Sequence, residues 1–184
     1  MKFTPAEHNF QNLLATYATH FLLEKKPDNF IKSIRTMENL EHRIEFVGSL
    51  KNISFYNDSK ATNIDSAITA INSLKNIFWI LGGREKKGGL KGIEDKLKKI
   101  IKAYTFGESK LNFRKFLNTE SIECKDFKNL KQALEAATKD AKKLKKNVNI
   151  LFSPACSSFD QFKNYEERGL FFKKLVSEKM KNEK

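Results

Sequence analysis

The stretch that decides the fold is Leu151-Phe-Ser-Pro-Ala-Cys-Ser-Ser-Phe-Asp-Gln-Phe-Lys-Asn-Tyr-Glu-Glu-Arg-Gly169. An apolar run over residues 148–152 ends at a Ser-Pro turn, small residues follow, and helical periodicity then begins. Ser158 and Gln161 have the spacing of a capping box, which predicts a helix over residues 159–180. A strand that leads through a small-residue loop into a capped helix presents free backbone N–H groups at the positive end of the helix dipole. The sequence therefore predicts an anion site here, suited to a phosphate or a carboxylate.

A second segment of the same design lies earlier in the chain and reads Asn57-Asp-Ser-Lys-Ala-Thr-Asn63. It follows a strand-like run over residues 53–56 and precedes a helix that the periodicity predicts over residues 62–74. Two such loops in one α/β chain indicate that an anionic ligand binds between them.

Strands and helices alternate from residue 42 onward. The predicted strands cover residues 43–47, 53–56, 77–81, 103–106 and 148–152, and the predicted helices cover residues 62–74, 93–101, 127–145 and 159–180. The run 77–81 is apolar throughout and ends at Gly82-Gly83, as is typical of a buried parallel strand. This order predicts an α/β fold, with a mostly parallel sheet flanked by helices and ligands near the carboxyl ends of its strands.

The first forty residues do not fit that unit. Residues 9–23 have helical periodicity, and Asp28 is placed to cap a short second helix that carries Phe30 and Ile34. Two helices without a preceding strand are typical of the end of another domain. We therefore divide the chain into a helical segment, residues 1–40, and an α/β domain, residues 41–184.

The composition is that of a globular protein. Of the 184 residues, 40% are hydrophobic and 31% are charged, which excludes intrinsic disorder. Cys124 and Cys156 form neither a metal-binding spacing nor a disulfide framework. No apolar run approaches the roughly 18 residues that span a bilayer, and residues 1–8 lack the apolar core of a signal peptide. We expect a cytoplasmic location, no membrane partner and no metal-ligating residues in this chain.

The formal net charge is +13, which raises the alternative of a basic nucleic-acid-binding domain. The lysines cluster over residues 96–102 and 139–146, where Leu, Ile and Ala interleave with them at helical spacing. That pattern is typical of the solvent-facing sides of amphipathic helices. Because aromatic residues do not interleave with these clusters, no nucleic-acid partner is expected.

Five segments, taken in order, resemble motifs of the Mur ligase family. They are His8-Asn-Phe-Gln-Asn12, His42-Arg-Ile-Glu45, residues 57–63, Leu81-Gly-Gly-Arg-Glu-Lys86 and residues 153–169. The resemblance runs through nearly the whole chain, and the third and fifth segments are its most specific parts. Within the family, the chain is most similar to the enzymes that add D-glutamate to UDP-N-acetylmuramoyl-L-alanine in peptidoglycan biosynthesis.

The resemblance implies a three-domain ligase, with a UDP-binding domain, a central P-loop ATPase domain and a Rossmann-like domain that brings the amino acid. Residues 1–40 resemble the tail of the central domain and residues 41–184 the Rossmann-like domain. ATP, with Mg²⁺ bound mostly by the central domain, would convert the substrate carboxylate to an acyl phosphate, which the amine of D-glutamate attacks. No G-x-x-x-x-G-K-[ST] phosphate loop occurs here. We therefore expect this chain to need the N-terminal and central domains as partners for turnover.

The resemblance also assigns ATP-binding roles to three residues. Asn12 would contact the adenine, Arg43 would reach the phosphates, and Asp58 would bind the ribose. Each has a plainer alternative. Asn12 is equally well explained as an exposed helix amide, Arg43 could form a salt bridge with Glu41 or Glu45, and Asp58 could cap a turn.

The first loop supplies the predicted catalytic residue. By resemblance, Lys60 would face the acyl phosphate or the incoming amino acid, and Thr62 would hold a carboxylate of D-glutamate while opening the next helix. Lys86 would pair with the α-carboxylate, although the adjacent Lys87 could take that place. A lysine in a loop between a strand and a helix has an electrostatic purpose at an anion site, but an ordinary loop lysine is the alternative.

The second loop completes the predicted amino-acid site. Ser158 would hold the side-chain carboxylate of D-glutamate, helped by Phe159 and Tyr165, and the Ser158 hydroxyl would face a cavity shared with Thr62. Ser158 could instead serve only as a helix cap. Cys156 has no base in its motif and is not expected to be a nucleophile. The other function that remains open is a stand-alone ligand-binding module derived from such a ligase.

Overall fold

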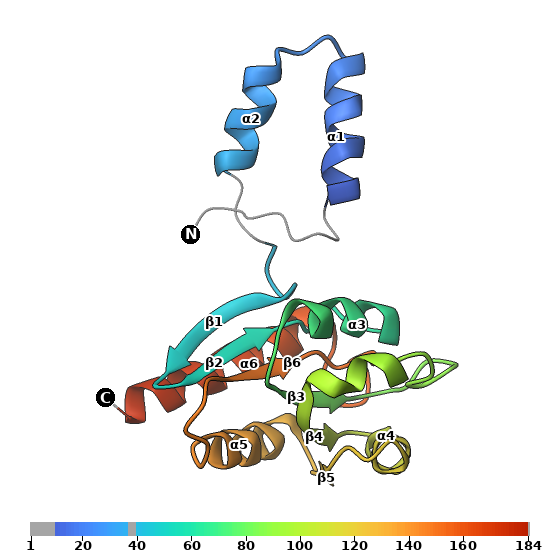
Figure 1. Ribbon diagram of the computed structural model, residues 1–184, viewed down its shortest axis with the longest axis vertical. Helices are drawn as coiled ribbons and strands as arrows, with labels where there is room; N and C mark the ends of the chain where they lie inside the picture. Colours follow the sequence, from blue (N-terminus) through green and yellow to red (C-terminus); the bar gives the residue numbers. More distant parts are fainter. Residues whose placement is uncertain (1–9, 37–39, 184) are drawn as a thin grey trace. The chain divides into compact units, whose positions relative to one another are not determined.

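The computed structural model describes residues 10–36 and 40–183 (Figure 1). The chain divides into two compact units, with the boundary between Glu41 and His42. That the first unit is the tail of an ATPase domain stays a prediction.

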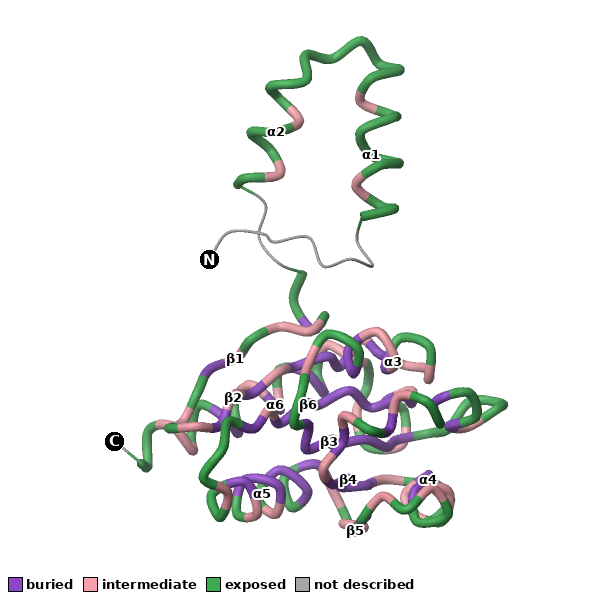
Figure 2. The backbone as a smooth tube through the Cα atoms, in the orientation of Figure 1, coloured by how far each residue is buried: buried purple, intermediate pink, exposed green. Residues whose placement is uncertain are grey.

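The first unit contains two helices, α1 (Phe10–Leu22) and α2 (Pro27–Thr36). Proline at the first position of α2 has the backbone angle that a helix start needs and lacks only an N–H that would be unpaired there. The ring centroids of Tyr17 and Phe30 lie 5.1 Å apart, which joins the two helices. Neither helix contains a buried residue, as Figure 2 shows.

The second unit is built on a sheet of six strands in the order β1-β2-β6-β3-β4-β5. The strands are β1 (Glu45–Leu50), β2 (Ile53–Asn57), β3 (Ile77–Gly82), β4 (Ile100–Phe106), β5 (Cys124–Asp126) and β6 (Val148–Phe152). Only β1 runs antiparallel to its neighbour, and the other pairings are parallel. The predicted mostly parallel α/β fold is confirmed.

Helices cover both faces of the sheet. They are α3 (Ile64–Ser73), the 3₁₀ helix η2 (Glu94–Lys99), α4 (Lys110–Thr119), α5 (Leu130–Ala141) and α6 (Tyr165–Asn182). One core cluster joins α3, η2 and α4 to the face that carries Trp79, and the other joins α5 and α6 to the face that carries Phe78 and Ile80. Every residue of β3 is buried (Figure 2), as its apolar sequence predicts.

Four of the predicted helices have wrong boundaries. The helix predicted over residues 127–145 is α5, which spans only Leu130–Ala141. The helix predicted over residues 93–101 is a short 3₁₀ helix that ends at Lys99, because Ile100 already pairs with β3. The helices predicted from residues 62 and 159 begin at Ile64 and Tyr165. In both of these the preceding asparagine, rather than the predicted residue, caps the helix.

Candidate functional site

The loops that leave the carboxyl ends of the parallel strands meet at one edge of the sheet, where α/β proteins bind ligands. The loop after β2 carries Lys60 and Thr62, and the loop after β6 carries Ser158 and Phe159. Because β2 and β6 are neighbouring parallel strands, these two loops leave the sheet side by side. The loops after β3 and β4 leave at the same edge.

Asp58 ties the first loop to two other segments. Its carboxylate accepts hydrogen bonds from the Ser153 hydroxyl at 2.6 Å and from the Ile44 backbone N–H at 3.2 Å. Its own N–H donates to the carbonyl of Phe152 at 2.7 Å. The residue is only 5% exposed, and this burial raises the pKa of the Asp58 carboxyl to about 7, although both hydrogen bonds oppose the rise. Asp58 thus has a structural role beside its predicted contact with the ribose.

His42 forms the core of a buried polar junction beneath the same loop. Its Nδ1 lies 2.9 Å from the side-chain amide of Asn57, and its carbonyl accepts from the N–H of Lys60 at 3.1 Å. Asn57 also donates to the Glu45 carboxylate at 3.1 Å. Gly169 on α6 packs so closely that a Cβ there would lie 2.3 Å from the His42 ring. The junction therefore fixes where the loop begins.

Lys60 and Tyr165 face each other across the two loops. The Lys60 ammonium lies 5.3 Å from the centroid of the Tyr165 ring, a cation–π contact that holds the charge near the start of α6. The prediction that Thr62 opens the next helix is wrong, since Asn63 caps α3 by accepting from the N–H of Ser66 at 2.9 Å. Thr62 is half-buried in the loop itself.

The capping box predicted at Ser158 is also wrong. The carbonyl of Ser158 accepts from the N–H groups of Gln161 and Phe162, which makes a turn instead of a helix start. The cap of α6 is Asn164, whose side chain accepts from the N–H of Glu167 at 2.7 Å. Ser158 is therefore not at the start of a helix, and the predicted anion site at a helix N-terminus there is wrong. Ser158 is buried in the turn.

Phe159, the next residue in this turn, is 63% exposed. Its side chain therefore contributes little to the core. A role of Phe159 in binding D-glutamate beside Ser158 stays a prediction.

The loop after β3 is pinned against the loop after β6. Arg84 and Ser157 exchange backbone hydrogen bonds of 3.0 and 3.1 Å, and the Arg84 guanidinium forms a two-pronged ion pair with Glu108. Lys86 and Lys87 follow on an exposed turn. These contacts hold the start of the lysine-bearing loop beside the turn that carries Ser158.

A sequence model of the Mur ligase glutamate ligase domain matches residues 42–156, most of the α/β unit just described. The chain belongs to the Mur ligase family. A protein of Rickettsia conorii named UDP-N-acetylmuramoylalanine--D-glutamate ligase is 45% identical over 173 residues, which are 92% of this chain and 34% of that protein. A protein of the same name from Wolbachia pipientis is 41% identical over 166 residues, 89% of this chain and 32% of that protein. The chain thus spans about a third of the length of these curated relatives.

Solved structures show the same fold. The UDP-N-acetylmuramate-alanine ligase MurC from Thermotoga maritima matches with a TM-score of 0.71 at 14% identity, over 98% of this chain and 39% of that one. A pseudomurein peptide ligase type C from Methanothermus fervidus matches with a TM-score of 0.65 at 17% identity, over 96% and 37%. At these identities the likeness shows the fold of the Mur ligase domain alone.

The motif segment 153–169 also contains a buried arginine without a predicted role. Arg168, on α6, is fully buried and donates to both Ser59 and the carbonyl of Cys156. These contacts link the two predicted ligand loops. Cys156 itself is buried beside Ser109, and burial raises the pKa of its thiol to about 12, so little thiolate forms near neutral pH.

The predicted ATP-binding residues Asn12 and Arg43 are both exposed. Asn12 lies on α1 in the first unit, and Arg43 lies at the start of the second. Residues 8 and 9 of the first motif segment lie outside the described residues. The contacts of Asn12 and Arg43 with ATP stay predictions.

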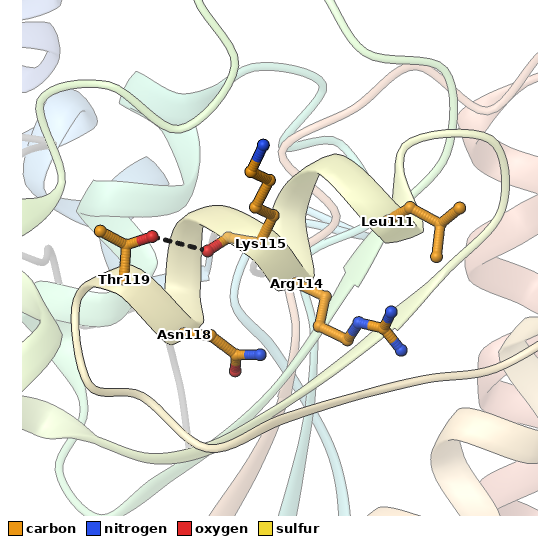
Figure 3. A pocket seen from close by; sticks show the side chains of 5 residues that line it. All are labelled: Leu111, Arg114, Lys115, Asn118 and Thr119. Atoms are coloured by element: carbon orange, nitrogen blue, oxygen red, sulfur yellow. Dashed lines mark hydrogen bonds between the residues drawn. The ribbon is translucent and has the colours of Figure 1, made fainter.

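A pocket on α4 lies away from the predicted site residues (Figure 3). It is an open depression lined by Leu111, Arg114, Lys115, Asn118 and Thr119. No predicted site residue lines it, and a cavity shared by Thr62 and Ser158 stays a prediction.

The described residues contain neither a candidate metal site nor a helix that could span a membrane. Nowhere in residues 10–36 and 40–183 do three or more His, Cys, Asp or Glu residues gather in a way that could hold a metal ion. Within the same ranges, no helix has the length and apolar character needed to cross a membrane.

Proposed function

We propose that this chain is the amino-acid-binding part of an ATP-dependent ligase that adds D-glutamate to UDP-N-acetylmuramoyl-L-alanine through an acyl phosphate. The observation that supports it most is the meeting of residues 57–63 and 153–165 at the carboxyl edge of the sheet, in a chain 45% identical to a relative of that name. Proteins add little covalent chemistry to an acyl phosphate reaction, so such a domain would act by position and charge.

In this proposal the two loops hold D-glutamate so that its amine points at the acyl phosphate. Thr62 would hold one carboxylate of D-glutamate, and Lys86 would pair with its α-carboxylate. Ser158 would hold the side-chain carboxylate, helped by the backbone around Phe159 and Tyr165. Lys60 would stabilise the negative charge that develops as the amine attacks. Its contact with the Tyr165 ring limits where the ammonium can lie.

The nucleotide would lie at the β1 side of the same edge. Asp58 would bind the ribose through carboxylate lone pairs that Ser153 and Ile44 leave free, and Arg43 would pair with the phosphates. Asn12 would contact the adenine. The Mg²⁺ that accompanies ATP would be bound mostly by the central ATPase domain of the ligase.

A chimeric enzyme tests the proposed function. The C-terminal part of the Rickettsia conorii relative is replaced with residues 1–184, and ATP-dependent addition of D-glutamate to UDP-N-acetylmuramoyl-L-alanine is measured. We expect activity from the chimera and none from residues 1–184 alone, because this sequence has no phosphate loop. Lys60→Ala should lower kcat of the chimera by about tenfold or more, because it removes a charge made for the transition state.

The control for the lysine is Lys139→Ala, an exposed lysine on α5 far along the chain from either loop. A chimera that folds, shown by circular dichroism and by a cooperative melting transition, yet adds no D-glutamate would contradict the proposed function. Addition of D-glutamate by residues 1–184 alone would contradict the expected dependence on the other domains.

The two loop hydroxyls are tested in the same chimera. Thr62→Ala and Ser158→Ala should each raise KM for D-glutamate by an amount equivalent to about 1–3 kcal/mol, because each leaves a carboxylate oxygen without its donor. Thr119→Ala and Ser73→Ala change exposed hydroxyls on α4 and α3 and serve as matched controls. An unchanged KM for D-glutamate in both loop variants would remove Thr62 and Ser158 from the binding site.

A further inference from the structure

The guanidinium of Arg168 lies at the centre of a contact set that spans both predicted ligand loops. Its Nε donates to the Ser59 hydroxyl at 3.1 Å, and its Nη2 donates to the carbonyls of Ser59 at 2.8 Å and of Cys156 at 3.0 Å. The side chain is fully buried and lies over the ring of Phe152, 5.9 Å from the centroid. One side chain of α6 therefore holds the ends of β2 and β6 at the same time.

This buried charge has an incomplete set of partners. Within the part of the chain that the structure describes, no carboxylate forms an ion pair with Arg168, and its Nη1 is the single buried side-chain nitrogen or oxygen without a hydrogen bond. Burial lowers the pKa of Arg168 to about 10, so the side chain remains protonated at neutral pH. The negative charge of Asp160 acts on Arg168 without forming an ion pair. Burying a charge that has no ion-pair partner costs free energy, and a fold that only needed to fill this space would do better with an apolar residue.

Nη1 of Arg168, the atom without a hydrogen bond, lies against a third loop, the one that follows β3. A Cβ added at Gly83 would lie 3.2 Å from Nη1 of Arg168, so the guanidinium packs directly against the backbone at the end of β3. The same Gly83 leaves no room for a side chain, because its Cβ would also lie 2.3 Å from the carbonyl of Ser157. Arg168 thus contacts all three loops that follow β2, β3 and β6.

Ser59 connects Arg168 to Lys60 through Tyr165. The hydroxyl that accepts from Arg168 donates in turn to the carbonyl of Tyr165 at 2.8 Å. Tyr165 is the first residue of α6, and its ring carries the Lys60 ammonium. The chain of contacts from Arg168 through Ser59 and Tyr165 therefore sets the place of Lys60 relative to the Ser158 turn.

We propose that Arg168 is a positioning residue that locks the loop of residues 57–63 to the loop of residues 153–158, and so sets the geometry of the amino-acid site. The locking follows from contacts within this chain, while its consequence for D-glutamate rests on the proposed function. Arg168 would not touch the substrate. A lysine could keep the charge but could not supply three hydrogen bonds in the fixed fork geometry of a guanidinium.

Amide hydrogen exchange on residues 1–184 tests the locking without any assay of activity. The N–H groups of Lys60, Ala61 and Ser157 donate to the carbonyls of His42, Asp58 and Arg84, respectively. In Arg168→Lys these three N–H groups should exchange about tenfold faster or more, while helix α5 keeps its rate. Arg114→Lys on α4 is the matched control and should leave both loops unchanged. An unchanged exchange rate in either loop of Arg168→Lys would overturn the proposal.

Ser59→Ala covers the case in which the arginine variant does not fold. It removes the hydroxyl that links Arg168 to Tyr165 but keeps the Ser59 carbonyl and the buried charge. We expect faster exchange at Lys60 and Ala61 in this variant, by about threefold or more, with a cooperative unfolding transition. Exchange at the wild-type rate in Ser59→Ala would likewise overturn the proposal.

The chimera then separates positioning from general destabilisation. Arg168→Lys should raise KM for D-glutamate about tenfold and leave KM for UDP-N-acetylmuramoyl-L-alanine unchanged, whereas a loss of folded enzyme would lower kcat and change neither KM. Faster loop exchange together with an unchanged KM for D-glutamate would show that the locking does not serve the amino-acid site. An inactive wild-type chimera would reject the proposed function, and the exchange rates alone would still decide whether Arg168 holds the loops.

Discussion

Replacing Asp58 with asparagine is expected to raise the free energy of unfolding at pH 8 by about 2–4 kcal/mol and to have little effect at pH 4. The carboxyl is 5% exposed, and its burial raises the pKa to about 7. At pH 8 the folded chain must therefore hold a buried negative charge. Asparagine keeps the shape and can still accept from Ile44 while its amide donates to the Ser153 oxygen, so the variant avoids the charge without losing both contacts.

The sign of the pH dependence follows from proton binding. The ordinary pKa of the aspartate carboxyl is 3.8, so between about pH 4 and pH 7 the folded chain binds a proton at Asp58 that the unfolded chain has released. The free energy of unfolding of the wild-type chain should therefore fall, through this group, as pH rises across that window. In Asp58→Asn this contribution to the slope should vanish.

Urea unfolding followed by fluorescence measures the effect, because Trp79 is the sole tryptophan of the chain and is fully buried in the α/β unit. The control is Asp140→Asn. Burial of Asp140 is outweighed by hydrogen bonds from Lys102 and Lys143, which hold the pKa of Asp140 below its usual range. That variant should be destabilised equally at pH 5.5 and pH 8. A wild-type minus Asp58→Asn difference that stays constant from pH 4 to pH 8 would contradict the raised pKa.

The sheet could be predicted from sequence because its strands are marked by local patterns. Residues 77–81 and 148–152 are short apolar runs bounded by Gly or Pro, and such runs identify buried parallel strands without knowledge of their partners. Two elements were missed. Strand β5 is only three residues long, and helix α4 mixes buried Phe113 and Leu117 with exposed Leu111, which blurs its periodicity.

The helix starts predicted at residues 62 and 159 are wrong for a reason that is visible in the sequence. Asn63, Asn129 and Asn164 all cap helices by accepting from the N–H three residues later. The pair Asn164 and Glu167 matches a capping pattern as well as Ser158 and Gln161 do, so two candidate starts competed within one motif. In the structure the helix starts at the Asn164 cap, and the Glu167 carboxylate also accepts from the N–H of Lys163 at 2.7 Å.

The part of the candidate site that could not be predicted depends on contacts between distant residues. Arg168 and Ser59 are 109 positions apart, and no local pattern marks an arginine as buried. The burial of Asp58 is of the same kind, since Ser153 lies 95 positions away. Patterns along the chain identified the loops, whereas the folded structure was needed to show which side chains hold those loops together.

Replacing Gly82 with alanine is expected to lower the free energy of unfolding by about 3–5 kcal/mol, as a forced backbone shift in a packed core does. Gly82 ends β3 with a φ of 132°, a conformation that residues with a Cβ rarely adopt. A Cβ there would lie 2.0 Å from the carbonyl oxygen of Phe106, and this neighbour is backbone of the adjacent strand β4. The strand ends would have to separate, and the loops that follow them would move with them.

Gly88→Ala isolates the collision from the backbone angle. Gly88 also has a positive φ, 101°, but a Cβ there meets nothing within 4 Å. Its replacement should therefore cost only about 1 kcal/mol, the penalty for a side chain in the left-handed region. Urea unfolding through Trp79 fluorescence compares the two variants at one pH. Equal losses in both would mean that the ends of β3 and β4 can part without cost, and their close approach would then not be what fixes the loops at the carboxyl edge of the sheet.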